Sequence, residues 1–114
     1  YHLRDINALF VEHFASAEEL RGKGVGSAVM NSLLERSGDS LVVLEVEPPE
    51  DELSRRRVQL YRRLGFTLND GSYFQPPFYG NPKPLPLMLM STRPLSASEF
   101  ASTAASIHRN VYKA

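Results

Sequence analysis

A glycine-rich turn that leads into a helix constrains this chain more than any other sequence feature. Gly22, Gly24 and Gly26 fall within five residues, after an apolar stretch at 8–15 and before a helical pattern over about 27–36. Glycine loses much conformational freedom on folding, so such a cluster marks backbone that is left-handed or closely approached by a ligand. Backbone amides at the start of a helix bind anions. The turn therefore favours a phosphate or pyrophosphate site, and a plain connecting loop is the alternative.

The apolar pattern around this turn predicts an α/β domain with a mixed sheet. The stretches 8–15 and 41–46 are apolar or β-branched, as buried strands are, and the helix joins them. A strand, a helix and a strand in this order form a right-handed parallel crossover. The remaining pattern predicts a hairpin over 1–16 with its turn at 5–7, a helix over 51–64 ending at Gly65, a strand at 66–68 and a turn at 69–72. It then predicts a loop over 73–86, with or without a short strand at 73–74, followed by a strand at 87–90 and a helix over 97–112.

Composition excludes several classes of protein. The 114 residues suffice for one domain, and 13 basic against 13 acidic residues give no net charge that would hold a nucleic acid. No apolar run approaches the roughly 20 residues of a membrane span. The absence of cysteine rules out disulfides and thiolate catalysis, and three scattered histidines argue against a metal site. These features predict a cytoplasmic protein that binds neither metal, membrane nor nucleic acid.

Two known phosphate loops fit the turn poorly. The Walker A pattern is not present. The dinucleotide pattern G-x-G-x-x-G is nearly met by Gly22-x-Gly24-x-x-Ser27, with Glu45 roughly 20 residues further on. In that pattern, however, the first glycine directly follows the strand. Here residues 17–21 intervene, and the third glycine is replaced by serine.

A third pattern fits in full. Arg21-x-x-Gly24-x-Gly26 resembles the [QR]-x-x-G-x-[GA] loop of the GNAT superfamily of N-acetyltransferases. Residues 60–66 (LYRRLGF) are similar to the L-Y-x-x-L-G-F signature of that family, and residues 14–16 stand where its strand end lies. The motifs cover about 8–68, and the remainder of the chain agrees by topology only.

The resemblance implies a GNAT-like acyl-CoA N-acyltransferase fold, in which central parallel strands splay apart and helices flank the sheet. The chain would form a single domain, 1–114, that comprises the C-terminal portion of this fold and ends in a helix within 96–114. The first strands and helices of the family's fold would lie before residue 1. The edge of the sheet would then be covered by such a segment or by a second copy in a homodimer.

The resemblance also implies an activity, the transfer of an acetyl group from acetyl-CoA to a primary amine of a small molecule or peptide, by direct attack in a ternary complex. Loop amides would hold the pyrophosphate, while the strand end would pair with the pantetheine arm and polarise the thioester carbonyl. Ser54 stands seven residues before Tyr61, where the family often has an asparagine that contacts this arm. The implied cofactor-binding residues are Phe14, Ala15, Ser16, Arg21, Gly22, Lys23, Gly24, Val25, Gly26, Ser27 and Ser54.

Tyr61 is the implied general acid for the departing thiolate. A phenol has a pKa of about 10 and a thiol of about 8.5, so proton donation is chemically reasonable. The alternative is a tyrosine that fills the interface between helix and sheet. Glu12 is the candidate base, directly or through water, or else the partner of a neighbouring arginine. Glu45 and Glu47 share one face of their strand and could bind the amine or the water that relays its proton to the base, although ion pairs with nearby arginines are favoured.

Two other functions are compatible with the sequence. An acyl-CoA-binding module would keep the loop without catalysis, and a dinucleotide-binding domain would bind NAD. The aromatic and proline-rich segment 73–80 would bind the acceptor amine, cover the core or form a dimer seam. The arginines at 55–57 and 62–63 would contact the 3′-phosphate of CoA or an acidic partner, or form a solvated helix face, which is the favoured interpretation.

Overall fold

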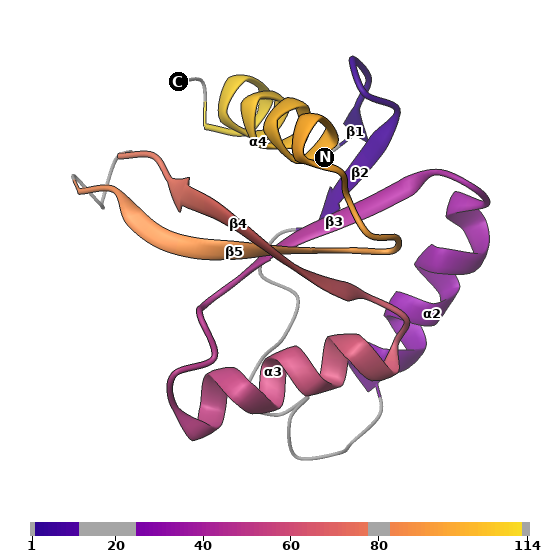
Figure 1. The fold of residues 1–114 in the computed structure, drawn as a ribbon. Helices are drawn as coiled ribbons and strands as arrows, with labels where there is room; N and C mark the ends of the chain where they lie inside the picture. Colours follow the sequence, from indigo (N-terminus) through magenta and orange to yellow (C-terminus); the bar gives the residue numbers. More distant parts are fainter. Residues whose placement is uncertain (1, 12–24, 78–82, 113–114) are drawn as a thin grey trace.

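The fold is that of a computed structural model, which describes residues 2–11, 25–77 and 83–112 (Figure 1). Its elements are β1 (His2–Leu3), β2 (Ala8–Val11), α2 (Val25–Ser37), β3 (Leu41–Val46), α3 (Glu52–Arg63), β4 (Thr67–Gln75), β5 (Leu85–Ser91) and α4 (Ala97–Asn110). The predicted first strand is confirmed over 8–11, and its remainder at 12–15 lies outside the described residues. The helix after the glycine-rich turn, the strand at 41–46 and the two later helices are confirmed.

The described strands form one mixed sheet of five strands in the order β1-β2-β3-β5-β4. β2 and β3 are parallel, with Ala8 opposite Leu41 and Val11 opposite Leu44, as the crossover through α2 requires. The other neighbouring strands are antiparallel, including the N-terminal hairpin of β1 and β2. The predicted α/β class with a mixed sheet is therefore confirmed.

Helices cover both faces of the sheet, so two apolar cores form (Figure 1). On one face, α4 contributes Ile107 to a core that includes Val43. On the opposite face, α2 contributes Met30 to a core that includes Val42 and residues of α3. Successive residues of β3 enter different cores because side chains alternate along a strand. This arrangement explains why β3 is apolar throughout except at Glu45.

The two later helices each begin at a capping box. In α3, the Asp51 side chain accepts a hydrogen bond from the Ser54 backbone N–H at 2.7 Å, and the Ser54 hydroxyl accepts one from the Asp51 N–H at 3.2 Å. In α4, Ser96 and Glu99 form the same reciprocal pair. At the end of α3, Gly65 has a φ of +102°, which turns the chain into β4.

The segment 69–72, predicted as a turn, is instead an irregular stretch within β4. The register of β4 against β5 shifts between Asn69 and Tyr73, as at a β-bulge. The buried Asn69 amide donates a hydrogen bond to the Leu89 carbonyl at 3.1 Å, and its side-chain oxygen accepts one from the Leu95 N–H at 3.1 Å. The turn prediction is wrong because these distant partners keep the segment in the sheet.

β4 and β5 are both longer than the strands predicted at 66–68 and 87–90. Tyr73 pairs with Leu87 and Gln75 pairs with Leu85, so both strands extend into the segment 73–86 that was predicted as a loop. Tyr73 and Gln75 are two residues apart on one strand, so their side chains share one face of the sheet. Tyr73 belongs to the core beneath α4, which identifies this face.

Asp5, in the turn between β1 and β2, bonds to side chains of α4. Its carboxylate accepts hydrogen bonds from the Ser106 hydroxyl at 2.6 Å and the Asn110 amide at 3.3 Å, and it pairs with Arg109 at 2.5 Å. The bond from Ser106, followed by that from Arg109, lowers the pKa of Asp5 below its ordinary value of 3.8. Because the pKa is lower in the folded state, ionised Asp5 stabilises the fold above pH 3.8.

We expect Asp5→Asn to lower the free energy of unfolding at neutral pH, and we expect this deficit to shrink as the pH falls through the lowered pKa of Asp5. Protonated aspartic acid and asparagine both lack the charge that pairs with Arg109, so the two proteins converge in acid. Urea denaturation of both proteins at a series of pH values measures the deficit. A deficit that stays constant below pH 3.8 would contradict the electrostatic role of Asp5.

Candidate functional site

The helix that follows the glycine-rich turn begins before the last glycine of the turn. α2 starts at Val25, so Gly26 and Ser27 lie in its first turn, where backbone N–H groups have no partner within the helix. The remaining predicted loop and strand-end residues lie outside the described residues: Glu12, Phe14, Ala15, Ser16, Arg21, Gly22, Lys23 and Gly24. The start of the helix is confirmed, and the anion-binding loop stays a prediction.

Tyr61 lies in the core between α3 and the sheet. Its side chain is 4% exposed and shares this core with Met30 of α2. Its ring meets Phe66 edge to face, with 5.9 Å between ring centroids, and the Phe66 N–H donates to the Tyr61 carbonyl at 3.0 Å. The turn at Gly65 thus folds the phenylalanine of the motif back onto its tyrosine. This contact explains the spacing of the LYRRLGF motif.

Ser54 has a structural role in this fold. Its side chain is 2% exposed, and its hydroxyl donates to the Asp51 carboxylate at 2.8 Å within the capping box of α3. The hydroxyl is buried and already hydrogen-bonded within the capping box, so it is poorly placed to bind a ligand. We therefore leave Ser54 out of the proposed cofactor site.

A carboxylate cluster, which consists of Glu45, Tyr73, Gln75 and Tyr112, lies on the other face of the sheet. The Tyr73 hydroxyl donates to Oε2 of Glu45 at 2.5 Å, and the Tyr112 hydroxyl donates to Oε1 at 2.7 Å. The Gln75 amide donates to the Tyr112 hydroxyl at 2.8 Å and lies 3.5 Å from Oε1. The predicted ion pair of Glu45 with an arginine is wrong, since its partners within the described residues are neutral.

The sequence offered one partial signal for this cluster. Tyr73 and Gln75 alternate along β4, so their side chains are on one face of the sheet. Glu45 and Tyr112 come from β3 and the end of α4, and their meeting depends on how that helix docks. Burial, followed by the Glu45 carboxylate, raises the pKa of Tyr73, so this hydroxyl stays a proton donor.

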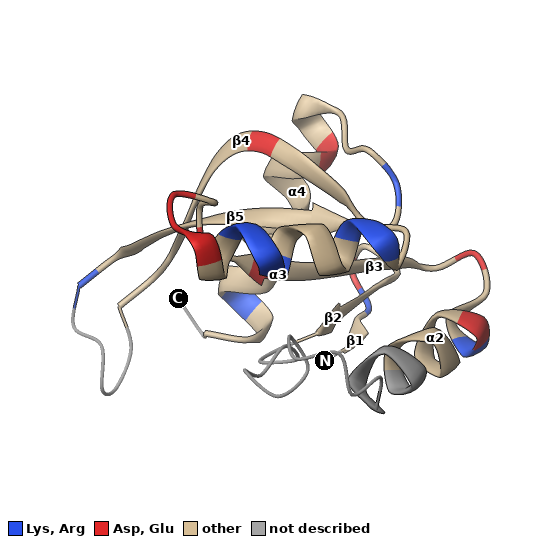
Figure 2. Ribbon diagram, turned by 90° about the horizontal axis from the view of Figure 1, so that it is seen from below, with Lys and Arg blue, Asp and Glu red and all other residues tan. Residues whose placement is uncertain are grey.

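The arginines of α3 line an exposed helix face, and Figure 2 shows this helix acidic at its start and basic along its length. Arg56 pairs with Glu52 at 2.6 Å, and Arg57 lies 3.6 Å from Glu47. The predicted ion pair of Glu47 is therefore confirmed. These contacts agree with a solvated helix face, as the sequence favours.

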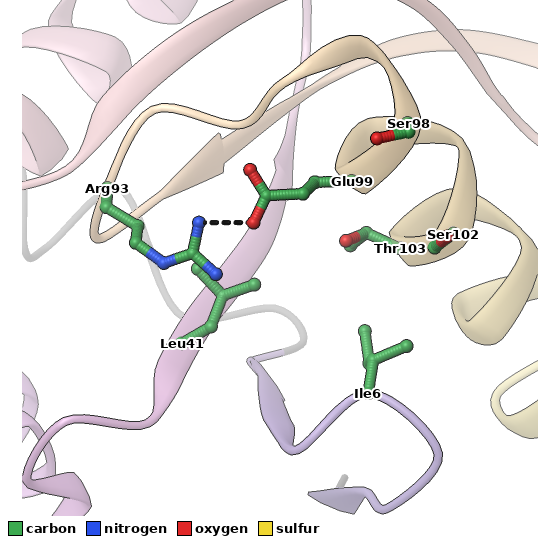
Figure 3. A pocket seen from close by; sticks show the side chains of 7 residues that line it. All are labelled: Ile6, Leu41, Arg93, Ser98, Glu99, Ser102 and Thr103. Carbon is green, nitrogen blue, oxygen red and sulfur yellow. Dashed lines mark hydrogen bonds and ion pairs between the residues drawn. The ribbon is translucent and has the colours of Figure 1, made fainter.

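A pocket of about 220 Å³ lies beside the first half of α4 (Figure 3). Ile6, Leu41 and Thr103 contribute to its wall, and Arg93 pairs with Glu99 at 2.7 Å within it. The ion pair neutralises the arginine. Leu41 is the first residue of β3, whereas ligands of open α/β sheets bind beyond the carboxyl ends of the strands. We assign this pocket no catalytic role.

Two further features were sought within residues 2–11, 25–77 and 83–112. No three of the histidines, aspartates and glutamates in these ranges gather as metal ligands would. No helix in the same ranges has the length and apolar character needed to cross a membrane.

Comparison with solved structures supports the fold. A structure described as a proposed acetyltransferase of the GNAT family from Bacteroides thetaiotaomicron superposes with a TM-score of 0.76 and is 35% identical. The match covers 92% of this chain and 61% of that chain, so this chain spans about three fifths of the other protein. A crystal structure described as histone acetyltransferase HPA2 and related acetyltransferase, from Corynebacterium glutamicum, is 29% identical with a TM-score of 0.46, covering 78% of this chain and 42% of that chain.

Comparison of sequences identifies the family. A search of curated proteins found no match. The sequence model of the acetyltransferase (GNAT) family matches residues 1–66, which is more than half of the chain. The predicted resemblance and the GNAT-like fold are therefore confirmed. This chain belongs to the GNAT family of acetyltransferases.

Proposed function

We propose that this protein transfers an acetyl group from acetyl-CoA to a primary amine of a small molecule or peptide. Membership of the GNAT family supports acyl transfer. The observation that carries the proposal is that α2 and Tyr61 share one core on one face of the sheet. α2 starts within the glycine-rich turn, and backbone amides at the start of a helix favour an anion such as a pyrophosphate. Acetyl-CoA bound on this face would extend from the start of α2, where its pyrophosphate would bind, toward the hydroxyl of Tyr61.

The proposed donor site uses backbone groups more than side chains. Amides of residues 23–27 would hold the pyrophosphate, and Arg21 would add a positive charge beside it. The strand end at 14–16 would pair with the pantetheine arm through its backbone. An N–H group there would stabilise the negative charge that develops on the thioester oxygen.

In the proposed reaction, the neutral amine attacks the carbonyl carbon of the thioester. The bond between this carbon and sulfur breaks, and the Tyr61 hydroxyl gives its proton to the departing thiolate. The proton lost by the amine passes to Glu12, directly or through water. Solvent then takes this proton from Glu12 and returns one to Tyr61. The net products are the acetylated amine and CoA.

We expect calorimetric titration of the full-length protein to show acetyl-CoA binding, and we expect Arg21→Ala to weaken it. A hydrogen bond to a charged group contributes about 1.5–3 kcal/mol, so the dissociation constant should rise about 10- to 100-fold. Free CoA should bind as well, because it carries the same pyrophosphate and pantetheine arm. NAD has a pyrophosphate but no pantetheine arm to pair with the strand end, so it should not bind.

Arg36→Ala is the matched control for charge, since Arg36 is exposed in the last turn of α2. Its side chain donates a hydrogen bond to the Ser32 carbonyl, one turn earlier in the same helix. This variant should bind acetyl-CoA as the wild type does. Failure to bind either CoA species would refute the proposed donor site, and binding of NAD instead would favour a dinucleotide site. Binding without acetylation of any amine would favour a non-catalytic acyl-CoA-binding module.

A further inference from the structure

We propose that the carboxylate cluster binds the second ammonium group of a diamine and so selects diamines as acetyl acceptors. This inference rests on the proposed function, because it names the acceptor class for that reaction. It begins from Glu45, whose carboxylate is held by two phenols from β4 and the end of α4. Three separate parts of the fold thus converge on one negative charge.

Among the described residues, the carboxylate of the cluster has no cationic partner. Elsewhere in the described parts of the chain, arginines pair with Asp5, Glu47, Glu52 and Glu99. Within the same ranges, the partners of Glu45 are two phenols and an amide, all neutral. A carboxylate that is partly withdrawn from water is costly unless its charge is paired. A cation supplied by a ligand would complete the pairing, and tyrosine rings add a favourable surface for an ammonium group.

The hydrogen bonds that Glu45 accepts suit a role in binding a cation better than a role as the catalytic base. Each carboxylate oxygen already accepts a hydrogen bond from a phenol. Both oxygens are therefore already engaged as acceptors, and proton removal is left to another group.

Glu45 lies at the end of β3 where a ligand of this fold is expected. The last described pair of the parallel strands is Val11 with Leu44, and Glu45 follows one residue later. Ligands of open α/β sheets bind beyond these carboxyl ends. α4 covers the face of the cluster, whereas α2 and α3 cover the face of the proposed donor site (Figure 1). The acceptor would therefore approach the thioester from the opposite face.

The acceptor class follows from the charges. A reacting amine must be neutral to attack the thioester, so its own nitrogen cannot supply a lasting cation to Glu45. A diamine meets both demands, because one nitrogen reacts while the other stays protonated. A monoamine of equal length lacks the second charge and should gain nothing from the cluster.

The test compares 1,5-diaminopentane with 1-aminopentane as ligands of the full-length protein. Calorimetry should show the diamine binding about 10- to 100-fold more tightly, as expected for a hydrogen bond to a charged group. Glu45→Gln should reduce diamine affinity to the level of the monoamine and leave monoamine affinity unchanged. In the acetylation assay, the ratio of kcat/KM values for the two amines should fall by the same factor. A residue that only supports the fold would not change this ratio.

Glu47→Gln is the matched control, because it removes the same charge from an exposed glutamate two residues further along. It should keep the diamine preference. If Glu45→Gln fails to fold, nuclear magnetic resonance of the wild type still decides, since the diamine should shift the Gln75 side-chain amide signal. Failure of the wild type to bind the diamine, or a preference that survives in Glu45→Gln, would overturn the inference. Acetyl-CoA binding, measured separately, decides the proposed function.

Discussion

Tyr61→Phe is expected to lower kcat about 10²- to 10⁴-fold, the contribution that a positioned general acid makes. Without the phenol, the CoA thiolate must leave unprotonated or wait for water. Phenylalanine keeps the ring that packs against Phe66 in the core beneath α3, so acetyl-CoA binding should change little. Steady-state acetylation assays give kcat, and calorimetry gives the affinity for acetyl-CoA.

The buried position of Tyr61 makes a control for stability necessary. The side chain is 4% exposed, so loss of a hydrogen bond at its hydroxyl could cost about 0.5–1.5 kcal/mol of folding free energy. Urea denaturation separates that effect from catalysis, because a folded variant at assay temperature should still lose kcat. A kcat equal to that of the wild type would give Tyr61 a packing role and direct the search for an acid elsewhere.

Local chemistry explains which parts of the fold the sequence predicts well. β3 is predicted because it is apolar on both faces, and both of its faces are buried by helices. The start of α4 is predicted because Ser96 and Glu99 satisfy each other's backbone within one turn. The end of α3 is predicted because Gly65 adopts a positive φ that other residues avoid. Each of these signals depends on neighbours in sequence.

The failures depend on partners that are distant in sequence. The segment 69–72 has the composition of a turn, yet Asn69 bonds to Leu89 and Leu95 and keeps the chain in the sheet. Glu45 is near many arginines in sequence, yet its partners are tyrosines 28 and 67 residues away. Sequence patterns predict where helices end and which strand residues share a face. The partners of Glu45 depend instead on how α4 docks on the sheet.

Ile107→Ala is expected to reduce the free energy of unfolding by about 2–5 kcal/mol, the range for truncating a fully buried isoleucine. Ile107 is 0% exposed and lies at the contact of α4 with Val43 and Leu89. Domains of this size are stable by about 5–15 kcal/mol, so the loss is a large share of the total. Urea denaturation followed by circular dichroism measures the change.

Ile107→Val is the matched control, because it removes one methyl group and should cost about 0.5–1.5 kcal/mol. The graded pair also tests the acceptor site, since Tyr112 reaches Glu45 only while α4 is docked. If the docking of α4 builds the carboxylate cluster, folded Ile107→Ala should bind 1,5-diaminopentane more weakly and acetyl-CoA as before. Equal stability losses in the two variants would contradict a tightly packed α4, and with it the idea that this helix sets the position of Tyr112.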